Sequence, residues 1–202
     1  MPDTGAPWNI PFLDGTELVR AYPDFSEDLA DAVADGLSAA GGLVAVKSAI
    51  FTGTQDNATA AGANFAVTNL EITHEVADPA NRLIISAFLG AAANSEGRGQ
   101  VGLAIHDGTD LIAIGDAALN RSRVTAGGNV QGTGVSLSTR VVTMPSVTFV
   151  HTPGAGSKTY TVRAINIRGD TRTLFINRSE NDVNSEFFPR AVSSLVIQEV
   201  KV

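Results

Sequence analysis

The spacing of apolar residues changes at Gly41-Gly42. Over residues 24–40 apolar side chains recur every three or four positions, which predicts one short amphipathic helix. Asp24 and Glu27 have the spacing of a capping box, and the two glycines end the helix. The apolar stripe of this helix consists of Phe25, Leu29, Val33, Leu37 and Ala40. Such a helix either packs on its own domain or joins a three-stranded bundle about a symmetry axis.

From Leu43 to Val202 the chain consists of segments rich in Val, Ile, Thr and Phe, which predicts β-strands. Clusters of Gly, Asn, Asp and Pro separate these segments, and His106-Asp107-Gly108-Thr109 has the composition of a hairpin turn. Strands are predicted at 43–52, 64–76, 82–91, 100–106, 110–115, 121–125, 135–142, 145–152, 158–168, 171–178 and 192–201. Many short strands without intervening helices predict an all-β fold, an antiparallel jelly roll or β-sandwich.

Residues 1–22 follow neither pattern. Prolines at 2, 7 and 11 favour an extended arm, because proline fixes φ and disfavours helix in the residue before it. The arm carries four large apolar residues with no neighbouring element to bury them, namely Trp8, Ile10, Phe12 and Leu13. We therefore expect it to dock on another surface. The predicted domains are 1–42, an attachment arm and helix, and 43–202, a β domain.

The composition of the chain excludes several classes of protein. The 202 residues are 44% hydrophobic and 17% charged, which is enough apolar material for a packed core. A net charge of −7 with scattered basic residues argues against a nucleic-acid partner. The chain has no cysteine, and its apolar runs are too short for a membrane helix. Its first residues lack a secretory signal, so synthesis in the cytoplasm without membrane insertion is expected.

Two glycine-rich segments resemble nucleotide-binding motifs but lack the required context. Gly154-Ala155-Gly156-Ser157-Lys158-Thr159 has Ser157 where a phosphate loop needs glycine, and a predicted strand follows it. We interpret it as a hairpin turn. Gly97-Arg98-Gly99-Gln100-Val101-Gly102 matches a dinucleotide-binding pattern in letters only, because no helix is predicted after it. We interpret that segment as a loop, and no cofactor is expected.

No catalytic or metal-binding constellation is found either. The histidines, His74, His106 and His151, are dispersed, so each is expected to be a solvated or hydrogen-bonded strand residue. The carboxylates of Asp107 and Asp110 fall in a predicted turn, where aspartate bonds the backbone. Three formal glycosylation sequons, at Asn57, Asn120 and Asn177, carry no weight without a secretory signal. We expect no enzyme and assign no catalytic residue.

Several segments, taken in order, resemble virion appendage proteins of bacteriophages. Pro7-Trp8-Asn9-Ile10-Pro11-Phe12, Gly15-Thr16-Glu17-Leu18-Val19-Arg20 and the predicted helix resemble an N-terminal module of tail-fibre and minor-tail proteins. The β region resembles a phage jelly-roll domain. The segments that carry this second resemblance are Asn69–Thr73, Asn81–Ile85, Phe149–Pro153, Lys158–Arg163, Phe175–Ser179, Phe188–Ser194 and Val196–Val200.

The resemblance implies a structural virion protein that forms homotrimers. In the first interpretation it is a tail or baseplate fibre, in which Trp8, Ile10, Phe12 and Leu13 dock on other virion proteins. Phe25, Leu29, Val33 and Leu37 then hold three chains together, and the jelly roll meets a host-surface glycan or protein. The alternative is a capsid decoration or head-fibre protein. Candidate host-contact loops are the long polar segments 94–99, 126–134 and 180–186.

Overall fold

A computed structural model describes residues 42–76, 78–93, 98–117, 119, 121–131, 142–186 and 188–202. These residues form an all-β, antiparallel structure with no helix among them. The all-β, antiparallel expectation is therefore confirmed. Leu43–Val202 forms one compact unit. The predicted arm and helix, with Trp8, Ile10, Phe12, Leu13, Phe25, Leu29, Val33 and Leu37, lie outside the described residues.

The first sheet, sheet A, joins the two ends of the described chain. It contains β1 (Leu43–Phe51), β12 (Ser193–Val200), β4 (Arg82–Phe88) and β9 (Ser146–His151), in that order. In β12, burial alternates strictly: Leu195 and Ile197 are fully buried, whereas Val196 is partly exposed. The predicted alternation of residues 192–201 therefore appears as one side facing the core and one side facing outward.

Sheets B and C complete the domain. Sheet C has the order β3 (Asn64–Val76), β10 (Gly156–Asn166), β6 (Arg98–His106) and β7 (Leu111–Ile112), and β8 (Ala126–Gln131) also pairs with β6. Sheet B contains β2 (Gln55–Thr59), β11 (Arg172–Ile176) and β5 (Ala91–Ala93). One hydrophobic cluster contains residues from all three sheets, among them Leu70, Ile85, Leu103, Leu174 and Ile197. This shared core is consistent with a β-sandwich.

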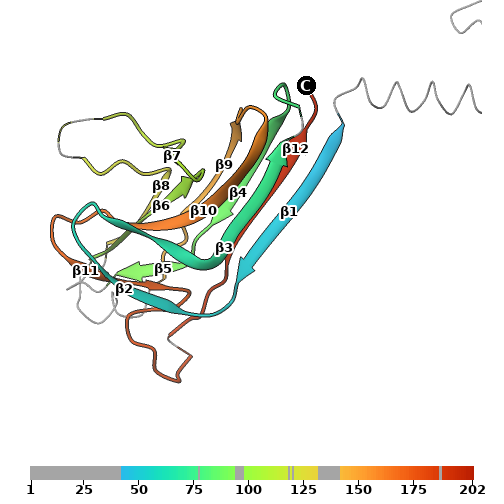
Figure 1. Ribbon diagram of the computed structural model, residues 1–202. Helices are drawn as coiled ribbons and strands as arrows, with labels where there is room; N and C mark the ends of the chain where they lie inside the picture. Colours follow the sequence, from blue (N-terminus) through green and yellow to red (C-terminus); the bar gives the residue numbers. More distant parts are fainter. Residues whose placement is uncertain are drawn as a thin grey trace, which may run out of the picture. The chain divides into compact units, whose positions relative to one another are not determined.

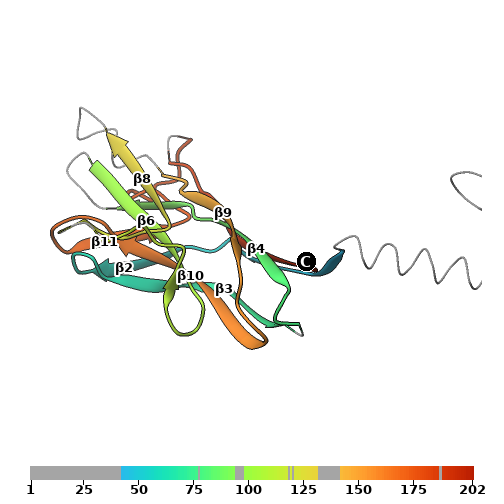
Figure 2. The ribbon, with the colours of Figure 1, turned by 90° about the horizontal axis from the view of Figure 1, so that it is seen from above.

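The domain has two distinct ends (Figures 1 and 2). At the entry end the chain enters β1 at Leu43 and leaves β12 at Val200, and these two residues pair. The turns 78–81, 107–110 and 152–155 lie toward the same end. Sheet B, the turns 60–63 and 167–171, and the segment 177–192 lie at the opposite, far end (Figure 1). These turns and segments therefore fall into two groups at opposite ends of the domain.

Some local predictions need correction. Residues 121–125 are not a strand, and the strand predicted at 110–115 is only Leu111–Ile112. Ala113 has a left-handed φ of 52°, which breaks extended pairing after Ile112. The glycine-rich segment 97–102, predicted as a loop, contains the start of β6. Ala126–Gln131, within a predicted contact loop, is strand β8. The predicted strand 135–142 lies almost wholly outside the described residues.

One predicted turn is confirmed and one needs correction. Residues 107–110 connect the antiparallel strands β6 and β7, and Gly108 has a φ of 95°. The segment 154–159, predicted as a hairpin turn, instead leads from β9 of sheet A into β10 of sheet C, and these two strands do not pair. Residues 156–159 already belong to β10, and Gly154 has a φ of 74°. A strand follows the turn, so its amides do not cap a helix as a phosphate loop requires.

Candidate functional site

A buried polar group connects the two larger sheets at the entry end. His74 lies on the inward side of β3, and Glu199 on the inward side of β12, in phase with Leu195 and Ile197. The imidazole Nε2 of His74 donates to the Glu199 carboxylate at 2.7 Å, and Asn81 Nδ2 donates to its other oxygen at 2.6 Å. Because the side chains of His74 and Glu199 are only 4% and 3% exposed, this group lies inside the core, away from any external substrate.

The turn between β6 and β7 holds a second ion pair nearby. Lys158 Nζ donates to Asp107 Oδ2 at 2.7 Å, and the backbone N–H groups of Thr109 and Asp110 donate to Asp107 Oδ1. Burial alone would raise the pKa of Asp107. The hydrogen bond from Lys158 and the two backbone bonds outweigh burial and hold that pKa well below its ordinary value of 3.8. The carboxylate therefore organises the turn as an anion.

His151 and Tyr160 form an edge-to-face pair beside this turn. Their ring centroids are 5.9 Å apart with an interplanar angle of 82°. Burial, and then the charge of Lys158, lower the pKa of His151, although Asp107 opposes them. Burial raises the pKa of Tyr160 above its usual range. Both groups are therefore neutral near neutral pH, and this favours a packing role for them.

Replacing Asp107 by asparagine should weaken the domain at neutral pH and flatten its response to acid. In the wild type the folded-state pKa of Asp107 lies below the unfolded value, so its stabilisation is complete above about pH 4 and declines as the pH falls further. Loss of the charged hydrogen bonds should cost about 1.5–3 kcal/mol at neutral pH. Equilibrium unfolding of both proteins across this range measures the difference, which should shrink toward acid. A constant difference would contradict the assignment.

At the far end, Asn177 joins four segments of backbone. Its side-chain Nδ2 donates to the carbonyl oxygens of Phe51 and Gly53, at 2.6 and 2.9 Å, and its Oδ1 accepts from Ser193 Oγ at 2.6 Å. Its backbone N–H donates to the Gly90 carbonyl at 2.7 Å. Asn177 is fully buried and has a left-handed φ of 58°. These bonds fix the positions of the segments that lead into and out of the far-end loops.

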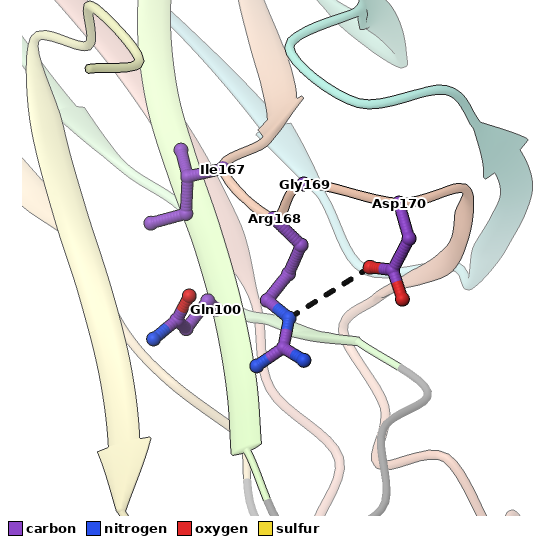
Figure 3. A pocket seen from close by; sticks show the side chains of 5 residues that line it. All are labelled: Gln100, Ile167, Arg168, Gly169 and Asp170. Atoms are coloured by element: carbon purple, nitrogen blue, oxygen red, sulfur yellow. Dashed lines mark ion pairs between the residues drawn. The ribbon is translucent and has the colours of Figure 1, made fainter. Parts of the chain in front are cut away.

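An open hollow lies on the far end between β6 and the turn from β10 to β11. It has a volume of about 550 Å³ and is lined by Gln100, Ile167, Arg168, Gly169 and Asp170. Figure 3 shows the Arg168 side chain between Gln100 and Asp170. The buried Asn166 fixes this turn, because its side chain donates to the Thr59 and Asp170 carbonyls and accepts from the Arg168 N–H.

The hollow combines an amide, a guanidinium and a carboxylate with one apolar side chain. Arg172 Nη2 forms an ion pair with Asp170 Oδ2 at 2.5 Å, whereas Arg168 Nε is 3.9 Å from the other oxygen of the same carboxylate. The hydrogen bond from Arg172 is the main reason that the pKa of Asp170 is lowered. A side chain at position 169 would have no atom of a non-adjacent residue within 4 Å of its Cβ, so the space beside Gly169 is open. Such a surface can exchange hydrogen bonds with a polar ligand.

The sequence analysis predicted only some of the polar residues and loops described above. The three histidines are strand residues as expected, and His106 Nδ1 accepts from the Gly108 N–H within the predicted turn. The sequence analysis did not predict that His74 pairs with Glu199. The position of Glu199, which alternates with the apolar residues Leu195 and Ile197, does indicate a buried carboxyl group that needs a partner. Asn177, noted only as a formal sequon, proves to be buried and fully bonded. The loop 180–186 lies at the far end, whereas residues 94–97 and 132–134 are outside the described residues.

Comparisons with known proteins give no family. No family model matches the sequence, and no curated protein matches it. In the part of the chain that the structure describes, no group of three or more His, Cys, Asp or Glu residues could hold a metal ion. Within the same residues, no helix has the length and apolar character needed to cross a membrane. The function therefore has to be argued from the residues and geometry above.

Proposed function

We propose that the protein is a structural, non-enzymatic virion component of a bacteriophage. In this proposal it is a subunit of a trimeric tail or baseplate fibre. Its N-terminal arm docks on the particle through Trp8, Ile10, Phe12 and Leu13, and the β domain is presented for host-surface attachment. The proposal starts from the resemblance of the sequence to phage appendage proteins, and the following features of the domain support it.

Strand order supports the finer assignment of the domain as a jelly roll. Sheet A has the order β1-β12-β4-β9, and the other large sheet has β3-β10-β6, with β8 beside β6. In both sheets, strands from the first half of the domain lie beside strands from the second half, and the first strand pairs with the last. Such interleaving is what two Greek keys wound into one sandwich produce.

The observation that carries the proposal is the separation of the two ends of the domain. The polypeptide that precedes Leu43 joins the domain at the entry end. The segment 177–192 and the turn 167–171 lie at the far end (Figure 1), and residues of that turn line the hollow. A subunit held on a particle through residues before Leu43 can therefore keep its far-end loops free. This arrangement suits attachment at one end and contact at the other.

The buried polar groups support a structural role over an enzymatic one. His74 and Glu199, which have the types of side chain used in acid–base catalysis, are enclosed in the core and bonded to each other. The hydrogen-bonding capacity of Asp107 is used by its own turn and by Lys158. A general acid or base must reach a substrate, and these groups hold strands and turns instead.

Removing residues 1–22 should leave a folded β domain that no longer assembles onto particles. Burial of a large apolar side chain contributes about 1.5–3 kcal/mol, so four such residues in three chains form a strong anchor. The measurement is incorporation of the truncated protein into purified particles, with the circular dichroism of the free protein as the control for folding. Normal incorporation would refute the docking role of the arm.

The number of copies per particle distinguishes the fibre from its alternative. A few trimers are expected of a tail or baseplate fibre, whereas many copies spread over the shell would indicate capsid decoration or a head fibre. Quantitative mass spectrometry of purified particles measures this number. Hydrolysis of a host polysaccharide by the purified protein would contradict both structural proposals.

A further inference from the structure

The outward side of sheet A carries almost no charged side chains. Strand alternation and the pairing register put fourteen side chains there. They are Val46, Ser48 and Ile50 of β1, Ser194, Val196, Gln198 and Val200 of β12, Arg82, Ile84, Ser86 and Phe88 of β4, and Ser146, Thr148 and Val150 of β9. Only Arg82 is charged, and it lies at the entry-end margin as the first residue of its strand.

This outer face is nearly uncharged, half of its side chains are apolar, and its hydroxyl groups are partly paired. Val46, Ile50 and Val150 are large side chains that are 52%, 61% and 60% exposed. Ser86 Oγ and Thr148 Oγ1 are 2.9 Å apart and bond to each other across β4 and β9. Lys47, the nearest lysine on β1, donates to the Thr73 carbonyl of β3 and so lies off this face. A contiguous surface of this kind is typical of a protein–protein interface.

The outer face is not flat. A shallow hollow of about 250 Å³ is lined by residues of β4, β9 and β12, among them Ser86, Thr148 and Val196. On the edge strand β1, Val46 and Ile50 are more than half exposed. Exposed apolar side chains and a hollow on one face suit a heterologous contact, in which β1 of one subunit packs against the hollow of the next. Such contacts form rings when the rotation from one subunit to the next closes.

The net charge of the chain sets a condition on any contact between two copies. Each copy carries a net charge of −7, so copies repel one another unless their contact excludes charge. The outer face of sheet A meets that condition. The chain also enters this face directly from the predicted helix 24–40, because Leu43 and Val44, at the start of β1, are 61% and 51% exposed. Copies joined through that helix would have these apolar residues beside one another.

We propose that the outward side of sheet A is the contact surface between copies of this chain. Val46 and Ile50 of one copy pack against the hollow on β4, β9 and β12 of the next, and three such contacts close a trimer. This inference rests on the self-association in the proposed function, but it is independent of any virion or host. It adds a second region of contact to the one predicted for the helix.

The test is the mass of the full-length protein carrying Val46→Glu and Ile50→Glu together. Both side chains point away from the core, so the variant should fold, and six added carboxylates per trimer should drive the copies apart. Sedimentation at micromolar concentration should give a trimer for the wild type and a monomer, with one third of that mass, for the variant. Val183→Glu, at a residue that is 58% exposed on the far-end loop, is the matched control and should stay trimeric.

Different results overturn different statements. A folded variant that remains trimeric would refute the sheet A contact and leave the trimeric fibre proposal intact. A wild-type protein that is monomeric at the same concentration would refute both. If the variant failed to fold, as judged by circular dichroism, the residues would have a role in the domain itself, and the inference would fall.

A single introduced thiol can distinguish two ways in which the hollow could be covered, by another copy or by residues 1–41 of the same chain. The protein has no cysteine, so Ser86→Cys gives one reactive site in the hollow. In the trimer the thiol should react with an alkylating reagent at least about tenfold more slowly than in the Val46→Glu, Ile50→Glu background, because reaction then requires opening of the contact. Equal protection in a monomeric protein would show that residues 1–41 cover the hollow and would overturn the inference.

Discussion

Replacing Glu199 by alanine should lower the free energy of unfolding by about 3–5 kcal/mol, because it leaves two buried hydrogen-bonding groups without their partner. The substitution leaves His74 Nε2 and Asn81 Nδ2 without their acceptor in a region where the glutamate is 2% exposed. Urea unfolding at one fixed protein concentration measures the effect, because self-association makes apparent stability depend on concentration.

Glu75→Ala is the matched control for this prediction. Glu75 follows His74 on β3, and its side chain is exposed, so the same chemical change should stay within about 0.5 kcal/mol of the wild type. The double substitution His74→Leu, Glu199→Leu should cost less than the sum of the two single substitutions, because it removes both members of the hydrogen bond together. A loss below about 1 kcal/mol for Glu199→Ala would mean that the pair contributes little to holding the sheets together.

Strands that alternate clearly were predicted to within a few residues. β3 coincides with its predicted range 64–76, and β12 lies within 192–201, because each has one side in the core and one side exposed. β2 was missed because Gln55-Asp56-Asn57-Ala58-Thr59 has no apolar alternation. Backbone pairing with β11 makes this segment a strand, and pairing partners distant in sequence leave no local pattern.

The polar groups of the core were harder to foresee for the same reason. His74 and Glu199 are 125 residues apart in sequence, and nothing near either residue indicates its partner. The topology that brings β3 against β12 is decided by the whole chain, since it depends on which strands pair in each sheet. Turns were predictable because Asp-Gly and related pairs act locally. Virion location and host contact stay predictions from resemblance, supported by the two-ended shape of the domain.

Replacing Asn177 by alanine should cost about 3–5 kcal/mol, from unsatisfied buried partners and from backbone strain. The substitution removes both donors to the Phe51 and Gly53 carbonyls and the acceptor for Ser193 Oγ. It also puts alanine at a φ of 58°, a left-handed conformation that asparagine adopts more readily because its short polar side chain can hydrogen-bond locally. Chemical denaturation measures the total effect. Because Asn177 anchors the far-end segments, the 177–192 loop should also become more sensitive to limited proteolysis.

Asn69 supplies the control that separates the two causes. It has nearly the same backbone conformation, with a φ of 56°, but its side chain is exposed. Asn69→Ala should therefore report the lost left-handed preference of asparagine alone, below about 1 kcal/mol, and Asn69→Gly should be close to neutral. Asn177→Gly relieves the strain and still loses the side-chain bonds, so it should remain at least about 2 kcal/mol below the wild type. If Asn177→Gly matched the wild type, the buried amide would not be what fixes the far end, and its left-handed backbone alone would explain the asparagine.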